Sequence, residues 1–251
     1  MARYGMVIDL DRCQGCRTCM EACKVENSTP QGIFWMHVFR FEEGTYPDVR
    51  VRFMPRPCMH CENPPCVKAC ELCTAKPSPR YQREDGLVAT DWEKCIGCRY
   101  CQAACPYGVN YFNWKEPREN YYLTWDVPEL KAVTGTALPP YKNPELDEPY
   151  GREQRRIAGG GHRARVIEKC TFCVHRLEKG ILQTACAQVC PVKAIIFGDL
   201  DDPGSEVARV LREKRSFRLR EEFGTRPKVY YVTSAPLAAG VREIDRVGGV
   251  R

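Results

Sequence analysis

The chain has 251 residues, a length that fits one large domain or two small ones. Its formal net charge is +6, from 38 Lys and Arg residues against 32 Asp and Glu residues. No apolar run of about 18 residues or more occurs, so we expect no transmembrane helix. Nothing at the start of the chain resembles a secretory signal peptide, because the first ten residues contain no long apolar stretch.

Sixteen of the 17 cysteines fall into four compact groups. The groups are Cys13, Cys16, Cys19 and Cys23; Cys58, Cys61, Cys66 and Cys70; Cys95, Cys98, Cys101 and Cys105; and Cys170, Cys173, Cys186 and Cys190. Groups one and three have the spacing C-x2-C-x2-C-x3-C, by which bacterial-type ferredoxins bind cubane clusters. Sixteen thiolates are enough for four [4Fe–4S] clusters, and a row of clusters relays electrons.

The positive net charge does not by itself indicate nucleic-acid binding. An oxidised cluster with four thiolates carries about −2, so four clusters add about −8 and offset the basic excess. Basic residues flank many of the cysteines, although an ordinary solvated position is the alternative for any one of them. These residues are Arg17, Lys24, Lys68, Lys94, Arg99, Lys169 and Lys193.

Two other uses of cysteine are less consistent with the pattern. A disulfide-rich secreted scaffold is usually much shorter and does not need this regular spacing. Zinc sites commonly use C-x2-C pairs, but they join two separated pairs, whereas three or four cysteines in one short run are typical of a cluster site. We therefore favour iron–sulfur clusters over zinc.

In chain order, residues 6–9 are predicted to form a strand before group one, and a helical turn is expected from Met20. Residues 9–19 match residues 91–101, which a second short strand at 87–90 precedes. In this internal repeat, Gly15 and Gly97 occur where a ligand loop must turn tightly and bring backbone N–H groups close to sulfur.

The interval of 24 residues between Cys70 and Cys95 is typical of a two-cluster ferredoxin. We therefore pair groups two and three into one unit, and groups one and four into another. Pairing one with two and three with four is the alternative that spacing leaves open. Residues 109–112 and 194–198 are predicted to be the return strands of ferredoxin hairpins.

Residues 113–165 contain no cysteine and are rich in Pro, Tyr, Trp and charge. We expect an insertion that docks on a partner, with an unstructured insertion as the alternative. The small basic segment 155–165 fits either an acidic partner surface or a solvated loop. Residues 206–213 are predicted to form a capped amphipathic helix and residues 228–233 a strand, followed by an exposed or partner-wrapping tail.

No catalytic constellation and no glycine-rich nucleotide loop is recognisable. The four histidines are His37, His60, His162 and His175. His60 and His175 lie within groups two and four, where we interpret them as ordinary polar loop residues, with tuning of a cluster by a hydrogen bond as the alternative. Cys73 is the cysteine outside the four groups, and we expect it to be a small buried residue rather than a spare thiol or a substitute ligand.

Several motifs together resemble the four-cluster iron–sulfur subunits of the complex iron–sulfur molybdoenzymes, the DMSO reductase-type family, whose members serve polysulfide, thiosulfate, tetrathionate and arsenate reductases. The motifs are GMVIDL at 5–10, CENPPCV at 61–67, KCIGC at 94–98, ACPYG at 104–108, KCTFC at 169–173 and GDLDDP at 198–203. They cover most of the chain. One departure is Glu71, which stands after Cys70 where the family usually has proline.

The resemblance implies four cubane clusters whose ligands cross between groups. The implied sets are cluster A with Cys13, Cys16, Cys19 and Cys190; cluster B with Cys23, Cys170, Cys173 and Cys186; cluster C with Cys58, Cys61, Cys66 and Cys105; and cluster D with Cys70, Cys95, Cys98 and Cys101. It also implies two partners, a large catalytic subunit with a molybdenum or tungsten bis-pterin cofactor and an integral membrane subunit that exchanges electrons with quinone.

These observations predict an α+β fold of two bacterial-ferredoxin-like units with pseudo-twofold cluster pairs. One unit comprises residues 1–57 and 166–200, and the other comprises 58–112; an insertion spans 113–165 and a C-terminal extension spans 201–251. The chain itself is expected to be a non-catalytic electron-transfer subunit. It is membrane-associated through its partners, either on the periplasmic side by co-export with a signal-bearing partner or in the cytoplasm. A free soluble polyferredoxin and a zinc-stabilised binding module are the alternatives.

Overall fold

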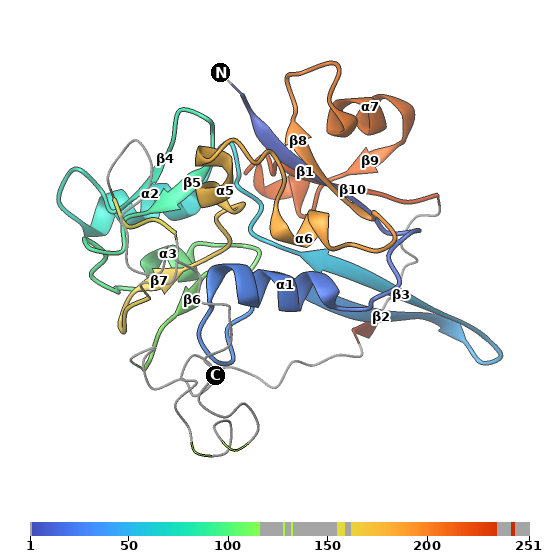
Figure 1. The fold of residues 1–251 in the computed structure, drawn as a ribbon, viewed down its shortest axis with the longest axis horizontal. Coiled ribbons are helices and arrows are strands. Elements are labelled where there is room, and N and C mark those ends of the chain that lie inside the picture. The colour runs from blue at the N-terminus through green and yellow to red at the C-terminus, as the bar shows by residue number, and fades with distance from the viewer. Residues whose placement is uncertain are drawn as a thin grey trace.

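The computed structural model describes residues 2–115, 155–158 and 162–234, together with positions 128, 132 and 242–243. Most of the predicted insertion and of the C-terminal tail lies outside the described residues. Short strands and short helices follow one another along the chain (Figure 1), so the expected mixed helix and strand content is confirmed.

The largest sheet has the strand order β8-β1-β10-β9. Its strands are β1 (Tyr4–Asp9), β8 (Ile195–Asp199), β9 (Ser216–Phe217) and β10 (Val229–Val232). β1 pairs antiparallel with β8 and parallel with β10, so a strand before the first cysteine group lies beside one that follows the last. Met6, Val7 and Ile8 of β1 are completely buried, because both faces of this strand are covered.

Helix α7 (Glu206–Glu213) covers one face of this sheet. Val7 lies on this side with Val207 and Val210, whereas Met6 and Ile8 belong to the main core. The helix begins after Ser205, whose Oγ accepts a hydrogen bond from the Ala208 N–H at 3.2 Å. The predicted capped helix and the predicted strand at 228–233, which corresponds to β10, are thereby both confirmed.

A long hairpin extends away from the rest of the chain at the right of Figure 1. It consists of β2 (His37–Thr45) and β3 (Asp48–Arg56), which pair antiparallel along their whole length. The short strand β11 (Arg242–Glu243) pairs with β2. The sequence pattern did not predict this hairpin.

The segment that carries groups two and three is made of short elements, drawn at the left of Figure 1. They are α2 (Pro65–Cys73), β4 (Arg80–Gln82), β5 (Val88–Thr90), α3 (Tyr100–Ala103) and β6 (Tyr111–Phe112). β4 and β5 form a hairpin between the two cysteine groups. The predicted strands at 87–90 and 109–112 correspond to β5 and β6.

The partner of β6 differs from the one expected for a self-contained ferredoxin hairpin. β6 pairs antiparallel with β7 (Ile167–Glu168), which lies just before group four. The ladder continues through Asn113, whose N–H donates to the Val166 carbonyl oxygen at 3.0 Å and whose carbonyl oxygen accepts from the Arg165 N–H at 2.7 Å. Backbone pairing thus joins the segments that carry groups three and four.

The remaining helices are short. They are α1 (Thr18–Asn27), α5 (Val174–Glu178), α6 (Ala185–Gln188) and the 3-10 helix η3 (Glu221–Phe223). α1 packs against α6, so the helix that carries Cys19 and Cys23 lies beside the helix that carries Cys186. The helical turn expected from Met20 is confirmed as part of α1.

Candidate iron–sulfur cluster sites

Three cavities are each lined by four cysteines. Cavity C is lined by Cys58, Cys61, Cys66 and Cys105, cavity D by Cys70, Cys95, Cys98 and Cys101, and cavity A by Cys13, Cys16, Cys19 and Cys190. The unfilled space around each set, open solvent included, is about 320, 300 and 320 Å³, respectively. Each cavity takes three cysteines from one group and the fourth from another.

The other four cysteines form a fourth cluster of thiols, here called site B. Cys23, Cys170, Cys173 and Cys186 are all buried. Burial raises the pKa of the Cys23 thiol, and the neighbouring thiols of Cys170, Cys173 and Cys186 raise it further. The structure therefore brings group one together with group four and group two together with group three.

The four sites follow one another in the order A, B, C, D. Besides burial, the charge of Cys186 at site B raises the pKa of Cys19 at cavity A. The charge of Cys58 at cavity C likewise raises the pKa of Cys170 at site B. The charge of Cys66 at cavity C raises the pKa of Cys101 at cavity D. The end sites each contain an exposed cysteine, Cys16 in A and Cys98 in D.

The ligand loops of cavities A and D repeat one backbone design. Gly15 and Gly97 have φ angles of 67° and 68°, a left-handed conformation that favours glycine. A Cβ atom on Gly97 would lie 2.0 Å from the Arg165 carbonyl oxygen, so the loop also needs glycine for space. Before each loop an aspartate accepts a backbone N–H two residues on, Asp9 Oδ1 from Asp11 and Asp91 Oδ1 from Glu93, both at 3.1 Å.

Burial makes these sites unfavourable for thiolates that bind no cation. It raises the pKa of Cys101 to about 11 and that of Cys61, Cys170 and Cys186 to about 12. Neighbouring thiolates contribute to each of these shifts, since like charges repel at short range. Four thiolates become compatible with such a site only when a strongly cationic group binds between them, as the iron atoms of a cluster would.

The arrangement fits a cluster better than a single metal ion. A tetrahedral zinc site needs four sulfur atoms at about 2.3 Å from one point. Cavities with four cysteines around their walls suit a polynuclear group, which favours [4Fe–4S] clusters over zinc.

Hydrogen bonds to sulfur are present at several of these cysteines. The Ala194 N–H donates to Cys190 Sγ at 3.2 Å, and the Phe172 N–H donates to Cys170 Sγ at 3.5 Å. The Thr18 hydroxyl donates to Cys16 Sγ at 3.4 Å. Such bonds stabilise the thiolate and are one means by which a protein adjusts the reduction potential of a cluster.

His60 lies in a loop, as interpreted, but it is not an ordinary polar loop residue, and His175 lies in a helix. His60 is completely buried, stacked on Phe172 at 4.0 Å between ring centres. Its Nδ1 accepts the Val88 N–H at 3.1 Å, so Nε2 carries the proton and donates to the Cys170 carbonyl oxygen at 2.9 Å. His60 thus connects the ligand loop of cavity C with that of site B.

His175 lies in α5, where only 3% of the residue is exposed, and its Nε2 is 2.8 Å from Glu26 Oε1. Glu26 is part of α1, so this contact connects α5 with α1. The side chain therefore fastens two helices rather than occupying a solvated loop.

The prediction that Cys73 is buried is also wrong. Cys73 is the last residue of α2, its side chain is exposed, and it lies beside Cys98. Cys70, one helical turn earlier, is buried and lines cavity D. Residues three apart share a helix face, so the difference comes from the end of α2, where Glu71, Leu72 and Cys73 are all exposed.

Three buried basic side chains lie close to cavities C and D: Lys169 lines cavity C, Arg80 lines cavity D, and the charge of Cys58 at cavity C acts on Lys228. Arg80, Lys169 and Lys228 are 0%, 3% and 1% exposed. Lys169 was expected from its place beside Cys170, whereas Arg80 and Lys228 lie far from any cysteine in sequence and were missed. Among the flanking residues, Lys68, Lys94 and Arg99 are exposed, as the solvated alternative predicts.

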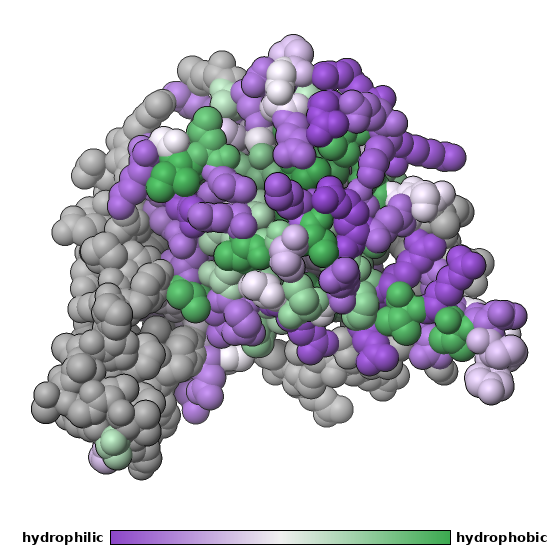
Figure 2. Space-filling view, turned by 45° about the vertical axis from the view of Figure 1, so that its right-hand side comes forward, coloured by the Kyte–Doolittle hydropathy of each residue, from purple (hydrophilic) through white to green (hydrophobic). Residues whose placement is uncertain are grey.

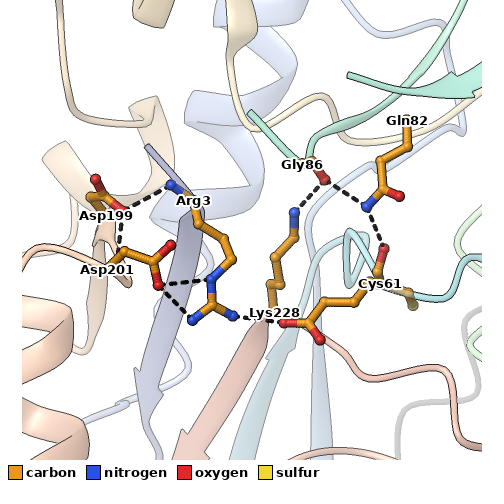
Figure 3. A network of polar contacts seen from close by, with 8 residues as sticks. Arg3, Cys61, Gln82, Gly86, Asp199, Asp201 and Lys228 are labelled. Atoms are coloured by element: carbon orange, nitrogen blue, oxygen red, sulfur yellow. Dashed lines mark hydrogen bonds and ion pairs between the residues drawn. The ribbon is translucent and has the colours of Figure 1, made fainter. Parts of the chain in front are cut away.

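Polar contacts fasten the ligand loop of cavity C to the large sheet, as Figure 3 shows. Arg3, just before β1, donates from Nη1 to Glu62 Oε1 at 2.7 Å and from Nη2 to Asp201 Oδ1 at 2.8 Å. On the other side of the loop, Lys228 Nζ donates to the Gly86 carbonyl oxygen at the turn of the β4–β5 hairpin.

Family models agree with this geometry. A model described as a 4Fe-4S dicluster domain matches residues 49–120, and a second model of the same description matches residues 94–194. A model described as a 4Fe-4S binding domain matches residues 4–25. Together they cover all four cysteine groups, so the chain binds several [4Fe–4S] clusters, and the number of cysteines is consistent with four.

Several curated proteins align with nearly the whole chain. A selenate reductase subunit of Mesobacillus selenatarsenatis is 44% identical over 232 residues, which cover 91% of this chain and 71% of that protein. The arsenate respiratory reductase iron–sulfur subunit of Shewanella sp. is 40% identical, covering 92% and 97%. A tetrathionate reductase subunit of Salmonella typhimurium is 36% identical, covering 92% and 72%.

The chain belongs to the four-cluster iron–sulfur subunits of the complex iron–sulfur molybdoenzyme family. The subunit carries electrons within a reductase complex and leaves substrate chemistry to a catalytic partner. The free polyferredoxin is not favoured, because the relatives are subunits of complexes. Among the described residues, no helix has the length and apolar character needed to cross a membrane.

Proposed function

We propose that this subunit holds four [4Fe–4S] clusters with ligands that cross between the cysteine groups. Cluster A takes Cys13, Cys16, Cys19 and Cys190; cluster B takes Cys23, Cys170, Cys173 and Cys186; cluster C takes Cys58, Cys61, Cys66 and Cys105; and cluster D takes Cys70, Cys95, Cys98 and Cys101. The observation that carries this proposal is the set of three cavities, each lined by the four cysteines of one such set. When bound, the clusters supply one-electron oxidation and reduction.

The domain layout follows from the same pairing. Residues 1–57 with 166–200 make the unit of clusters A and B, and residues 58–112 make the unit of clusters C and D. The two units are related by a pseudo-twofold arrangement of cluster pairs. The repeated loop conformation at Gly15 and Gly97 supports this relation, and the first dicluster match supports the second unit.

In the complex, electrons pass along the row A, B, C, D between two partners. The exposed Cys16 and Cys98 make the end clusters the points of exchange, while cluster B is shielded by burial. One partner is a catalytic subunit with a molybdenum or tungsten bis-pterin cofactor, as the family membership suggests. The other is an integral membrane subunit that exchanges electrons with quinone.

The name of one relative supports a partner that exchanges electrons with quinone. A menaquinone reductase iron–sulfur subunit of Nitratidesulfovibrio vulgaris is 36% identical in an alignment that covers 92% of this chain and 89% of that protein. The subunit is accordingly membrane-associated through its partners, at the periplasmic side after co-export with a signal-bearing partner or at the cytoplasmic side. The insertion at 113–165 docks on one of these partners, and residues 201–251 form a C-terminal extension.

Metal analysis of the assembled complex tests the function. A tag on this chain captures the complex anaerobically from native membranes, and iron, molybdenum, tungsten and zinc are then quantified. We expect iron together with molybdenum or tungsten and a large co-purifying subunit. Iron without a large partner would instead indicate a free polyferredoxin, and zinc in place of iron would refute the cluster assignment.

A further inference from the structure

Arg80 places a fully buried positive charge between cavities C and D. The residue is 0% exposed and lines cavity D. Its Nη1 donates to Asn110 Oδ1 at 2.5 Å, and Asn110 lines cavity C. The amide of Asn110 also donates from Nδ2 to the Cys101 carbonyl oxygen at 2.9 Å, in the ligand loop of cavity D. The guanidinium group therefore stands at the boundary between the two cavities.

No carboxylate among the described residues pairs with this guanidinium group. Its Nε and Nη2 are buried without a hydrogen-bond partner among those residues. Burial alone would lower the pKa of Arg80, yet the adjacent thiolates of Cys66 and Cys101, together with a side-chain hydrogen bond to Cys66, raise it above its ordinary value. An unpaired buried cation is strongly unfavourable, so the anionic clusters are the counter-charge that makes this position stable.

The charges of the two buried lysines near cavity C, unlike that of Arg80, are stabilised by backbone carbonyl oxygens. Lys169 Nζ donates to the carbonyl oxygens of Val88 and Cys170, and Lys228 Nζ donates to that of Gly86. Arg80 differs because two of its nitrogens point to no oxygen acceptor in the described structure. Its charge is also permanent, since a guanidinium group stays protonated in proteins.

We propose that Arg80 is a positioning residue of the relay that raises the reduction potentials of clusters C and D together. This inference rests on the ligand sets proposed above. Each cluster takes up one electron, no bond breaks, and no proton enters because the guanidinium group is already charged. The added negative charge interacts with Arg80 across an interior of low dielectric constant, so the reduced state is stabilised more than the oxidised state. Removal of this charge should therefore shift electrons away from the C–D end of the row.

A redox titration of the anaerobically purified complex, followed by EPR spectroscopy, tests this role. In Arg80→Gln we expect two of four midpoint potentials to fall, each by at least a tenfold loss in the equilibrium constant for reduction, or about 59 mV for a one-electron couple. The other two potentials should stay in place. Arg80→Lys retains a cation and should keep the two potentials closer to the wild type than Arg80→Gln does.

Two further variants make the test decisive. Lys68→Gln removes an exposed charge from α2 between Cys66 and Cys70, and it should leave all four potentials unchanged because water screens that charge. Asn110→Asp puts a carboxylate against the guanidinium group with little change of shape, and it should lower the same two potentials as Arg80→Gln. If Arg80→Gln loses iron, the potentials of Asn110→Asp test the proposal in its place.

Several results would overturn the proposal. These are unchanged potentials in Arg80→Gln, an equal shift of all four, a shift in Arg80→Lys as large as in Arg80→Gln, or loss of iron from both Arg80→Gln and Asn110→Asp. A wild-type complex without four cubane signals would refute the ligand sets themselves. That outcome is distinguishable, because it does not depend on any substitution at Arg80.

Discussion

At the scale of single residues, the proposed ligand sets use sixteen of the 17 cysteines, and the fold separates Cys70 from Cys73. Cys70 and Cys73 lie one helical turn apart on α2 and have opposite environments. Cys70 is buried in the wall of cavity D, and the Thr74 hydroxyl donates to its carbonyl oxygen at 2.7 Å. Cys73 is exposed beside Cys98. Burial in the cavity wall therefore favours Cys70 over Cys73 as the ligand.

Serine substitutions at these two positions should have opposite effects. Cys70→Ser removes a soft thiolate from cavity D, so we expect about four of sixteen iron atoms per chain to be lost, with the EPR signal of cluster D. Cys73→Ser should retain the full iron content. Iron quantification on anaerobically purified variants checks both. Full iron in Cys70→Ser, together with loss in Cys73→Ser, would show that Cys73 is the ligand.

A buried ion pair supports the core beside site B. His162 Nδ1 lies 2.7 Å from Glu168 Oε1, and its Nε2 lies 2.7 Å from the Asn27 carbonyl oxygen. Both ring nitrogens face acceptors, as they do in a protonated imidazole. Burial opposes this charge, but the Glu168 carboxylate raises the pKa of His162 above its ordinary value.

Since the pKa of His162 is raised on folding, its stabilisation is complete below the ordinary value near pH 6.5 and is lost as the pH rises through the folded value. His162→Gln should therefore destabilise the subunit by about 3 kcal/mol at pH 6 and by clearly less at high pH. Guanidinium denaturation followed by cluster absorbance measures the difference from the wild type. An equal loss at both pH values would mean that the pair is not ionic.

Residue spacing predicted the cysteine groups, because covalent ligation leaves a local pattern in the sequence. It did not predict Arg80 or Lys228. Arg80 follows Cys70 by ten positions and reaches the cavities only because β4 packs against α2. The buried state of His60 was missed for the same reason: Phe172, on which it stacks, is far away in sequence. Such residues become visible only in the folded chain.

At the scale of elements, each ligand loop depends on the strand before it and the helix after it. β1 leads into the first loop and α1 follows; β5 leads into the third loop and α3 follows. These elements were predictable from apolar runs and from the internal repeat. The pairing of β6 with β7 and the hairpin β2–β3 were not, since strand partners distant in sequence leave no local signal.

A substitution at Gly97 tests how strongly the third ligand loop depends on its backbone conformation and close packing. Gly97→Ala combines a φ angle of 68° with a Cβ contact of 2.0 Å to the Arg165 carbonyl oxygen. We expect a destabilisation of about 3 kcal/mol and loss of the cluster D signal in EPR. Gly108→Ala is the matched control, because it has a φ angle of 62° but nothing within 4 Å of the added Cβ.

Gly108→Ala should lower the free energy of unfolding by about 1 kcal/mol and keep cluster D, because it strains only the backbone conformation. Iron content and denaturation midpoints of both variants provide the comparison. Equal effects of the two substitutions would show that conformation, rather than the close approach of Arg165, limits the loop.

At the scale of the whole molecule, the surface around the D end of the row carries exposed apolar side chains. Exposed apolar side chains near cavity D include Leu72, Ile96 and Tyr100. The face in Figure 2 is mainly hydrophilic, with hydrophobic residues scattered among the polar ones. Family membership could be inferred from the motifs, but substrate and direction of electron flow belong to the complex, since the catalytic and membrane partners determine them.

The central claim is that this chain holds four cubane clusters in one row. The most direct test is quantitative EPR spectroscopy of the fully reduced, anaerobically purified complex, combined with iron and acid-labile sulfide analysis. We predict about sixteen iron and sixteen sulfide per chain, beyond those of the catalytic partner, and spin integrating to four reduced clusters. Markedly fewer clusters, or zinc in place of iron, would contradict it.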